Sequence, residues 1–87
     1  MDTRARIAWN LRHLRVSQKV TQENLAVDAQ VDRTVISDLE RGKHNASIDL
    51  MDRLALALST DISAFFSEPS PSDGKPEPMR AGRKPKT

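Results

Sequence analysis

The sequence predicts an all-α fold, a compact bundle of about five short helices. All five prolines come after residue 68, so no proline interrupts a helix in the first 66 residues. That stretch contains one glycine, Gly42, and its apolar residues recur at helical spacing. The sequence has no β-branched runs alternating with turn pairs, the pattern that would indicate strands.

The first two expected helices cover residues 3–18 and 22–29. The inward stripe of the first helix is Ile7, Leu11 and Leu14, spaced i, i+4, i+7. The second helix follows Thr21, whose hydroxyl suits an N-cap because it can accept a hydrogen bond from the first turn. The inward residues of the second helix are Leu25, Ala26 and Ala29.

The third expected helix covers residues 33–41. Asp32 precedes it as an N-cap, and Gly42 follows it as a C-terminal stop, because glycine readily adopts the left-handed conformation that ends a helix. Ile36 and Leu39 are expected to face the core from this helix.

The fourth and fifth helices are expected over residues 48–58 and 61–66. Ser47 would cap the fourth helix and Thr60 the short fifth one. The inward stripe of the fourth helix is Met51, Leu54, Ala55 and Leu58.

Residues 1–66 are expected to form one folded domain, and residues 67–87 a disordered, proline-rich basic tail. The tail has Met79 as its only large apolar residue, so it cannot bury enough surface to offset the entropy lost on ordering. Gly82–Pro85 is faintly similar to the core of a minor-groove AT-hook. The alternative is a solvated basic segment that gives only nonspecific attraction to DNA.

The composition disfavours several classes of protein. The chain has no cysteine, which removes disulfides, thiolate metal sites and cysteine nucleophiles. Aromatic residues are 3% of the chain, too few for a platform that stacks single-stranded bases. No apolar run approaches the roughly 20 residues of a membrane span, and no signal-peptide core is present, so a bacterial cytoplasmic or nucleoid location is expected. Without a nucleophile–base pair, a phosphate-binding glycine loop or clustered carboxylates, no enzyme is expected.

The net charge of +2 lies in the tail. The first 66 residues contain nine basic and nine acidic side chains and are neutral as a whole. An anion-binding surface on the folded part therefore depends on where individual charges are placed, since no overall positive charge is available.

Residues 22–41 predict two short helices joined by a tight turn. Ala26 supplies the small side chain needed where the two helices cross. The apolar wedge between the helices is Leu25, Val31, Ile36 and Leu39. The outward face of the second helix is Arg33, Thr34, Ser37 and Asp38. Short polar side chains beside an arginine at the start of a helix are suited to contacting base edges in a major groove.

The strings TQENLA at 21–26 and VDRTVISDLERGKHNASI at 31–48 resemble the helix-turn-helix domain of phage Cro and repressor proteins, the xenobiotic-response-element type. The resemblance covers about residues 7–66, and DRTVISDLERGKHN is similar in particular to the controller proteins of restriction–modification systems. It implies a lambda-repressor-like domain in a transcription regulator that binds double-stranded DNA. Such a regulator acts as a homodimer on a palindromic operator, without a cofactor or small-molecule ligand.

Two positions depart from the family pattern. Gln30 stands in the turn where the family usually has glycine, and a non-glycine residue in a left-handed conformation is unfavourable by roughly 1 kcal/mol. A slightly different turn is therefore expected. Ala46 stands where the family often has proline, before the N-cap of the fourth helix.

The resemblance places four residues of the third helix at base-reading positions: Arg33, Thr34, Ser37 and Asp38. Arg33 could bind guanine O6 and N7 with both ends of its guanidinium, or it could be a phosphate clamp or a solvated charge. Three interpretations of Asp38 stay open: it accepts from a cytosine amino group, pairs with Arg41, or repels phosphates as a specificity filter.

Five residues are expected to contact DNA phosphates: Gln22, Arg41, Lys43, His44 and Asn45. The alternative for Gln22 is an ordinary exposed residue at the start of a helix, and the alternative for the last four is a solvated loop. The resemblance also implies a partly buried ion pair between Arg15 and Glu40, which would tie the first helix to the end of the third. No metal site is expected, because His13 and His44 lack partners at ligand-like spacing.

The last two expected helices carry more apolar residues than a domain of this size usually buries. One face of them is therefore expected to form a two-fold dimer interface. The candidate interface residues are Met51, Leu58, Phe65 and Phe66. A second hypothesis is an antitoxin-like module that neutralises a partner protein and binds DNA secondarily.

Overall fold

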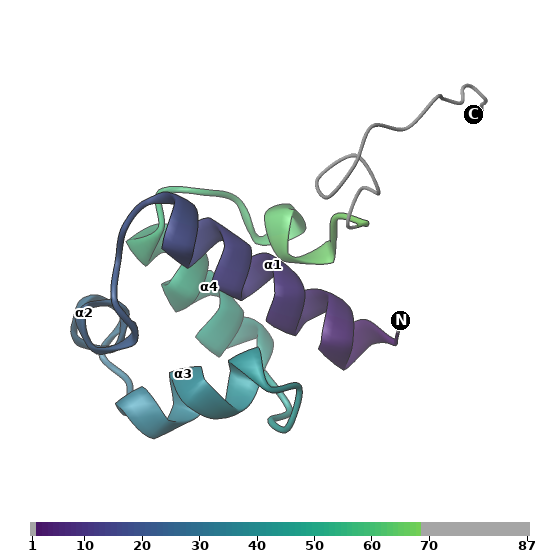
Figure 1. Cartoon of the computed structure of the whole chain (residues 1–87), viewed down its shortest axis with the longest axis horizontal. Helices are drawn as coiled ribbons and strands as arrows, with labels where there is room; N and C mark the ends of the chain where they lie inside the picture. Colours follow the sequence, from purple (N-terminus) through teal and green to yellow (C-terminus); the bar gives the residue numbers. More distant parts are fainter. Residues whose placement is uncertain (1, 69–87) are drawn as a thin grey trace.

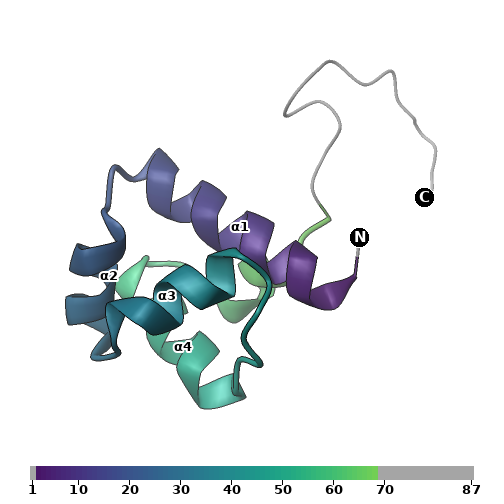
Figure 2. The ribbon, with the colours of Figure 1, turned by 60° about the horizontal axis from the view of Figure 1, so that its bottom comes forward.

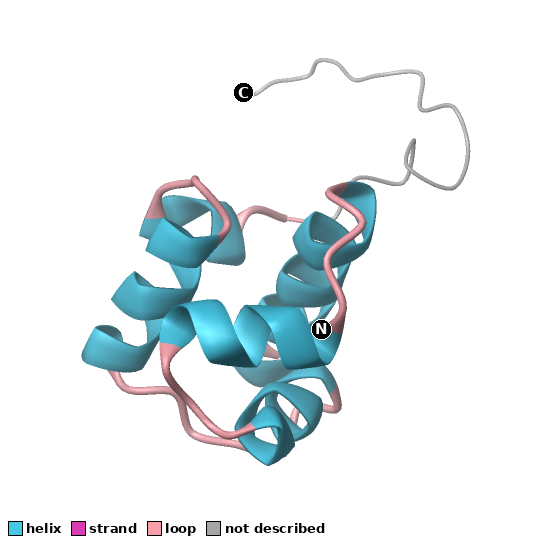
Figure 3. Cartoon of the chain, turned by 90° about the vertical axis from the view of Figure 1, so that its left-hand side faces the viewer, coloured by secondary structure: helices cyan, strands magenta, loops and turns pink. Residues whose placement is uncertain are grey.

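The computed structural model describes residues 2–68 and contains only helices and loops over that range (Figures 1 and 3). The elements are α1 (Thr3–Ser17), α2 (Gln22–Ala29), α3 (Arg33–Glu40), α4 (Ile48–Ala57) and the 3₁₀ helix η1 (Ile62–Phe66). The predicted all-α class is confirmed. No helix within the described range is long and apolar enough to span a membrane. Residues 69–87 of the predicted tail, which was expected over 67–87, lie outside the described residues.

Local hydrogen bonds explain where three of the helices begin. The Asp2 carboxylate accepts from the Ala5 amide at 2.8 Å, and the hydroxyls of Thr21 and Ser47 accept from amides three residues ahead at 3.0 Å. These are standard N-caps, which satisfy amides that the helix itself leaves unpaired. Asp32 occupies the N-cap position of α3, but its side chain makes no capping hydrogen bond.

The fifth element differs from the prediction. Residues 62–66 form a 3₁₀ helix rather than an α-helix, in keeping with the general use of 3₁₀ geometry for short pieces. Its cap is Asp61 and not Thr60: the Asp61 carboxylate accepts from the Ser63 amide at 2.9 Å. Hydrogen bonds from the Ser63 side chain and backbone lower the pKa of Asp61.

The core lies between the helices, and α1, α2, α3, α4 and η1 all contribute buried side chains to it (Figure 2). Its largest fully buried side chains are Leu11, Leu25, Ile36, Leu54, Leu58 and Phe65. Asn10 is the one polar residue within the described range that is buried as a whole residue, and its amide donates to the carbonyls of Phe65 and Ser67 at 2.9 and 2.7 Å. These bonds satisfy a buried polar group and attach the end of η1 to α1.

The turn between α2 and α3 contains no glycine. Gln30 adopts the left-handed conformation, with φ 61° and ψ 48°, and the next amide, Val31, donates to the Ala26 carbonyl at 2.9 Å. Gly42 ends α3 with φ 71°, as predicted. The structure therefore accepts some backbone strain at Gln30.

Replacing Gln30 with glycine is expected to make the chain more stable than replacing it with alanine, by about 0.5–1 kcal/mol. Glycine relieves the clash of the left-handed Cβ, although its greater freedom in the unfolded chain offsets part of the gain. Urea denaturation of both variants measures the difference. A glycine variant less stable than the alanine variant would show that position 30 carries no such strain.

Candidate nucleic-acid interface

Helix α3 lies on the outside of the bundle (Figure 2). One of its faces is buried and the other is open. Ile36 and Leu39 are buried against the core. The four predicted base-reading residues come together on the open face: Arg33 and Thr34 are exposed, and Ser37 and Asp38 are half-buried. An arginine and short polar groups are thus presented along a single exposed helix.

Helices α2 and α3 pack as a helix-turn-helix unit. Leu25, Ala26 and Ala29 are buried on α2, and Val31 in the turn packs against the same cluster. The small Ala26 side chain lies in this tightly packed region, as the sequence predicts. This arrangement is the one that places a second helix in the major groove of DNA in known helix-turn-helix complexes.

A hydrogen-bonded brace holds the end of α3. Arg15 donates from Nε to Glu40 Oε2 at 2.6 Å and from Nη2 to Glu40 Oε1 at 3.0 Å, and its Nη1 donates to the Val20 carbonyl at 2.8 Å. Gln22 Nε2 donates to Glu40 Oε1 at 3.1 Å. Only 13% of the Arg15 side chain and 5% of the Glu40 side chain are exposed. The brace therefore joins α1, the start of α2 and the end of α3 at the expected ion pair.

The brace also sets the electrostatics of Arg15. The hydrogen bond to Glu40 raises the pKa of Arg15 above its ordinary value, against the opposing effect of burial. A group whose pKa is raised on folding stabilises the folded chain at pH values below its unfolded-state pKa. This contribution is lost only as the pH rises through its folded-state pKa. Arg15 consequently stays charged throughout the neutral range.

Asp38 is engaged within the chain. Its Oδ1 accepts from Arg41 Nη2 at 2.7 Å, and Arg41 is the C-cap residue directly after α3. Of the three interpretations of Asp38, the ion pair with Arg41 is the one present in this DNA-free structure. An exposed pair of this kind contributes only about 0–1 kcal/mol, so either partner can leave it readily.

The remaining predicted phosphate contacts lie in the loop after α3 and differ in their exposure to solvent. Lys43 and Asn45 are exposed, and His44 is half-buried. The side-chain oxygen of Asn45 accepts from Arg4 Nε at 2.8 Å and also from Arg4 Nη2. Sequence reasoning missed Arg4, because 41 residues separate it from Asn45 and no motif links them.

The predicted dimer residues need correction. Met51, Leu58 and Phe65 are 6%, 0% and 1% exposed, so they belong to the core of a single chain. Only Phe66, at 40%, presents its side chain outside. The most exposed large apolar residue of α4 is Leu56, at 82%, which lay off the predicted inward stripe. The single chain therefore buries more apolar residues than we expected for a domain of this size, because η1 folds back onto α1 and α4.

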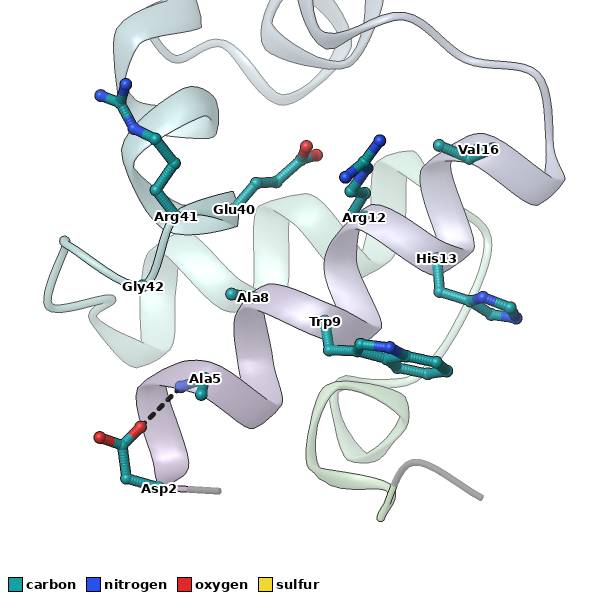
Figure 4. A pocket seen from close by; sticks show the side chains of 10 residues that line it. All are labelled: Asp2, Ala5, Ala8, Trp9, Arg12, His13, Val16, Glu40, Arg41 and Gly42. Atoms are coloured by element: carbon teal, nitrogen blue, oxygen red, sulfur yellow. Dashed lines mark hydrogen bonds between the residues drawn. The ribbon is translucent and has the colours of Figure 1, made fainter. Parts of the chain in front are cut away.

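Two further features border the site. Trp9 and His13 stack on α1 with ring centroids 4.6 Å apart, beside an open groove of about 720 Å³ (Figure 4). Within the described part of the chain, no three residues of metal-binding type lie together.

The packing of α2 and α3 and the polar open face of α3 define a helix-turn-helix protein.

Comparisons with known proteins agree with this class. A family model described as helix-turn-helix, HTH_3, matches residues 11–65. Control protein C.MunI from Mycoplasma is 31% identical over 68 residues, which cover 77% of this chain and 92% of that protein. The restriction-modification controller protein C.AhdI from Aeromonas hydrophila superimposes with a TM-score of 0.71 and 32% identity, covering 72% of this chain and 96% of that one.

The chain belongs to the helix-turn-helix family HTH_3, which confirms the resemblance seen in the sequence. This is a family of helix-turn-helix proteins and not of enzymes. A hypothetical transcription factor from Neisseria meningitidis is 39% identical over 57 residues, 66% of this chain. The chain spans 54% of that protein's length and 43% of the length of the immunity repressor protein of Bacillus phage phi105.

Proposed function

We propose that this protein is a transcription regulator that binds double-stranded DNA sequence-specifically, as a homodimer on a palindromic operator. The observation that carries the proposal is the open face of α3, where Arg33, Thr34, Ser37 and Asp38 lie together on a helix whose other face is buried. The relatives named as control, repressor and transcription-factor proteins support the same activity.

In this mechanism α3 is the recognition helix and enters the major groove. Its polar side chains contact base edges, while Gln22, Arg41 and the loop over residues 43–45 contact phosphates and set the position of the helix. Regulation follows from occupancy, because a protein bound across a promoter blocks or recruits the polymerase. The concentration of the regulator then sets its activity.

The homodimer requires an exposed apolar face. Leu56 on α4 and Phe66 on η1 supply the best candidates, since both are exposed and their two elements contact each other. An isologous contact around a two-fold axis would present two copies of α3 in the same orientation relative to DNA. We therefore assign the interface to Leu56 and Phe66 in place of the buried residues predicted from sequence.

Selection of bound sites from random duplex DNA tests this proposal. The expected sites are palindromic, with half-sites centred about 10–10.5 base pairs apart, because two-fold-related recognition helices enter successive major grooves. Single half-sites bound with one chain each would contradict the homodimer. A pool without any enriched sequence would contradict sequence-specific binding.

Arg33→Ala is expected to relax the base preference at one position of each half-site and to weaken binding of the selected site by roughly 1–3 kcal/mol. Lys43→Ala should weaken all duplexes alike and reduce the salt slope by about one per contact. Fluorescence anisotropy on matched and mismatched duplexes at several salt concentrations separates the two. A uniform loss in both variants would make Arg33 a phosphate clamp.

A further inference from the structure

We propose that a cleft between α1, α2 and α3 is a binding site for one DNA phosphate, with Arg12 and Arg41 as its cationic walls. The inference rests on the proposed function and adds to it a DNA contact from α1. The cleft has a volume of about 240 Å³. Its lining residues are Arg12, Arg15, Gln22, Ser37, Glu40 and Arg41.

The chemistry of this cleft fits an anion. Every lining residue is polar or charged, and the charged ones are three arginines and one glutamate. The larger groove beside it shares Arg12, Glu40 and Arg41 with this cleft, but its lining also includes the apolar residues Ala5, Ala8 and Val16. A surplus of guanidinium groups in a polar cleft favours phosphate, which arginine binds with two parallel hydrogen bonds.

The lining divides into groups already in use and groups available to a ligand. Arg15, Gln22 and Glu40 bond to one another in the brace and form a fixed part of the cleft. Arg12 is exposed and makes no hydrogen bond or ion pair with any other residue in the range 2–68. In Figure 4 its side chain lies on the side of α1 toward Glu40, away from Trp9 and His13. Its guanidinium is therefore available to a phosphate.

Arg41 reaches the same site by exchanging partners. In the DNA-free chain it pairs with Asp38, with 59% of the arginine side chain exposed. A phosphate in the cleft competes with that carboxylate, and a charge-assisted bond to a phosphate is stronger than an exposed ion pair. The exchange would leave Asp38 free to accept from a base. Phosphate docking and base reading are thereby coupled through one arginine.

The position of the cleft agrees with a role in DNA binding. Ser37 belongs both to the cleft and to the open face of α3, and Arg41 is the C-cap residue directly after that helix. A phosphate held there lies beside the bases that α3 contacts. The contact from α1 would fix the tilt of α3 in the groove, because α1 and α3 are joined by the brace.

The test combines arginine variants with duplexes in which one phosphate at a time is a neutral methylphosphonate, using the full chain and its selected site. Arg12→Gln is expected to weaken binding about tenfold and to reduce the salt slope by about 0.9 for each occupied cleft. The decisive result is positional. One methylphosphonate position should weaken binding by the wild type but cause little further loss of affinity in Arg12→Gln. Arg41→Gln should lose its sensitivity to the methylphosphonate at the same position.

Arg53→Gln is the matched control, because Arg53 is exposed on α4 and the substitution removes the same charge. Arg12→Lys should keep the salt slope and lose part of the affinity, since lysine retains the charge but not the planar fork. Thermal melting and sedimentation of all variants check folding and assembly. The inference is overturned if Arg12→Gln behaves as Arg53→Gln does, or if the Arg12 and Arg41 variants respond at different phosphates. A wild type that binds no duplex selectively would overturn the proposed function itself, and the inference with it.

Discussion

Glu40→Ala is expected to lower the free energy of unfolding by about 3 kcal/mol, the lower end of the range for breaking one side of a buried ion pair. Glu40 accepts three hydrogen bonds, two from Arg15 and one from Gln22, and its side chain is almost fully buried. Without it the Arg15 guanidinium keeps its charge in a site with little access to water. Arg15 retains the Val20 carbonyl as a partner, which limits the loss.

Urea denaturation followed by circular dichroism measures this effect. Asp38→Ala is the control, because it removes a carboxylate from the same helix and from an ion pair that is exposed. Its effect should stay within about 1 kcal/mol. Replacing Arg15 and Glu40 together by apolar residues of similar volume should be less damaging than Glu40→Ala, since no unpaired charge remains. Equal losses in Glu40→Ala and Asp38→Ala would show that the brace does not hold α3.

Phe65→Ala is expected to lower the free energy of unfolding by about 3–5 kcal/mol, whereas Phe66→Ala should change it little when measured on the monomer. Phe65 fills the core where η1 meets α1, and its removal leaves a cavity that the surrounding side chains fill only in part. Phe66 follows directly in sequence but lies outside. The pair thus compares the same substitution in two environments.

Sedimentation equilibrium provides the second measurement for these variants. If Phe66 belongs to the dimer interface, Phe66→Ala should raise the dimer dissociation constant, and Leu56→Ala should do the same. A Phe66 variant with wild-type association would remove Phe66 from the interface. A Phe65 variant as stable as the Phe66 variant would contradict the placement of Phe65 in the core.

The sequence by itself determined the parts of the fold that depend on neighbours in the chain. Helices α1 to α4 appear within one residue of their predicted bounds, because apolar spacing and N-caps act over three or four residues. The open face of α3 follows from the same periodicity, once Ile36 and Leu39 are assigned to the core. The pairing of Arg15 with Glu40 came from the family resemblance, since 25 residues separate them.

Only the tertiary structure decided the contacts between distant segments. The helical stripe shows that Met51 and Leu58 face inward together. It does not show that η1 covers them within one chain, which is why both belong to the core and not to the predicted dimer interface. The bonds from Arg4 to Asn45 and from Asn10 to residues 65 and 67 join positions 41 or more residues apart. The cleft beside Arg12 likewise forms only where residues from α1, α2 and α3 come together. Periodicity determines which face of a helix is apolar, whereas the packing of separate elements determines what each face meets.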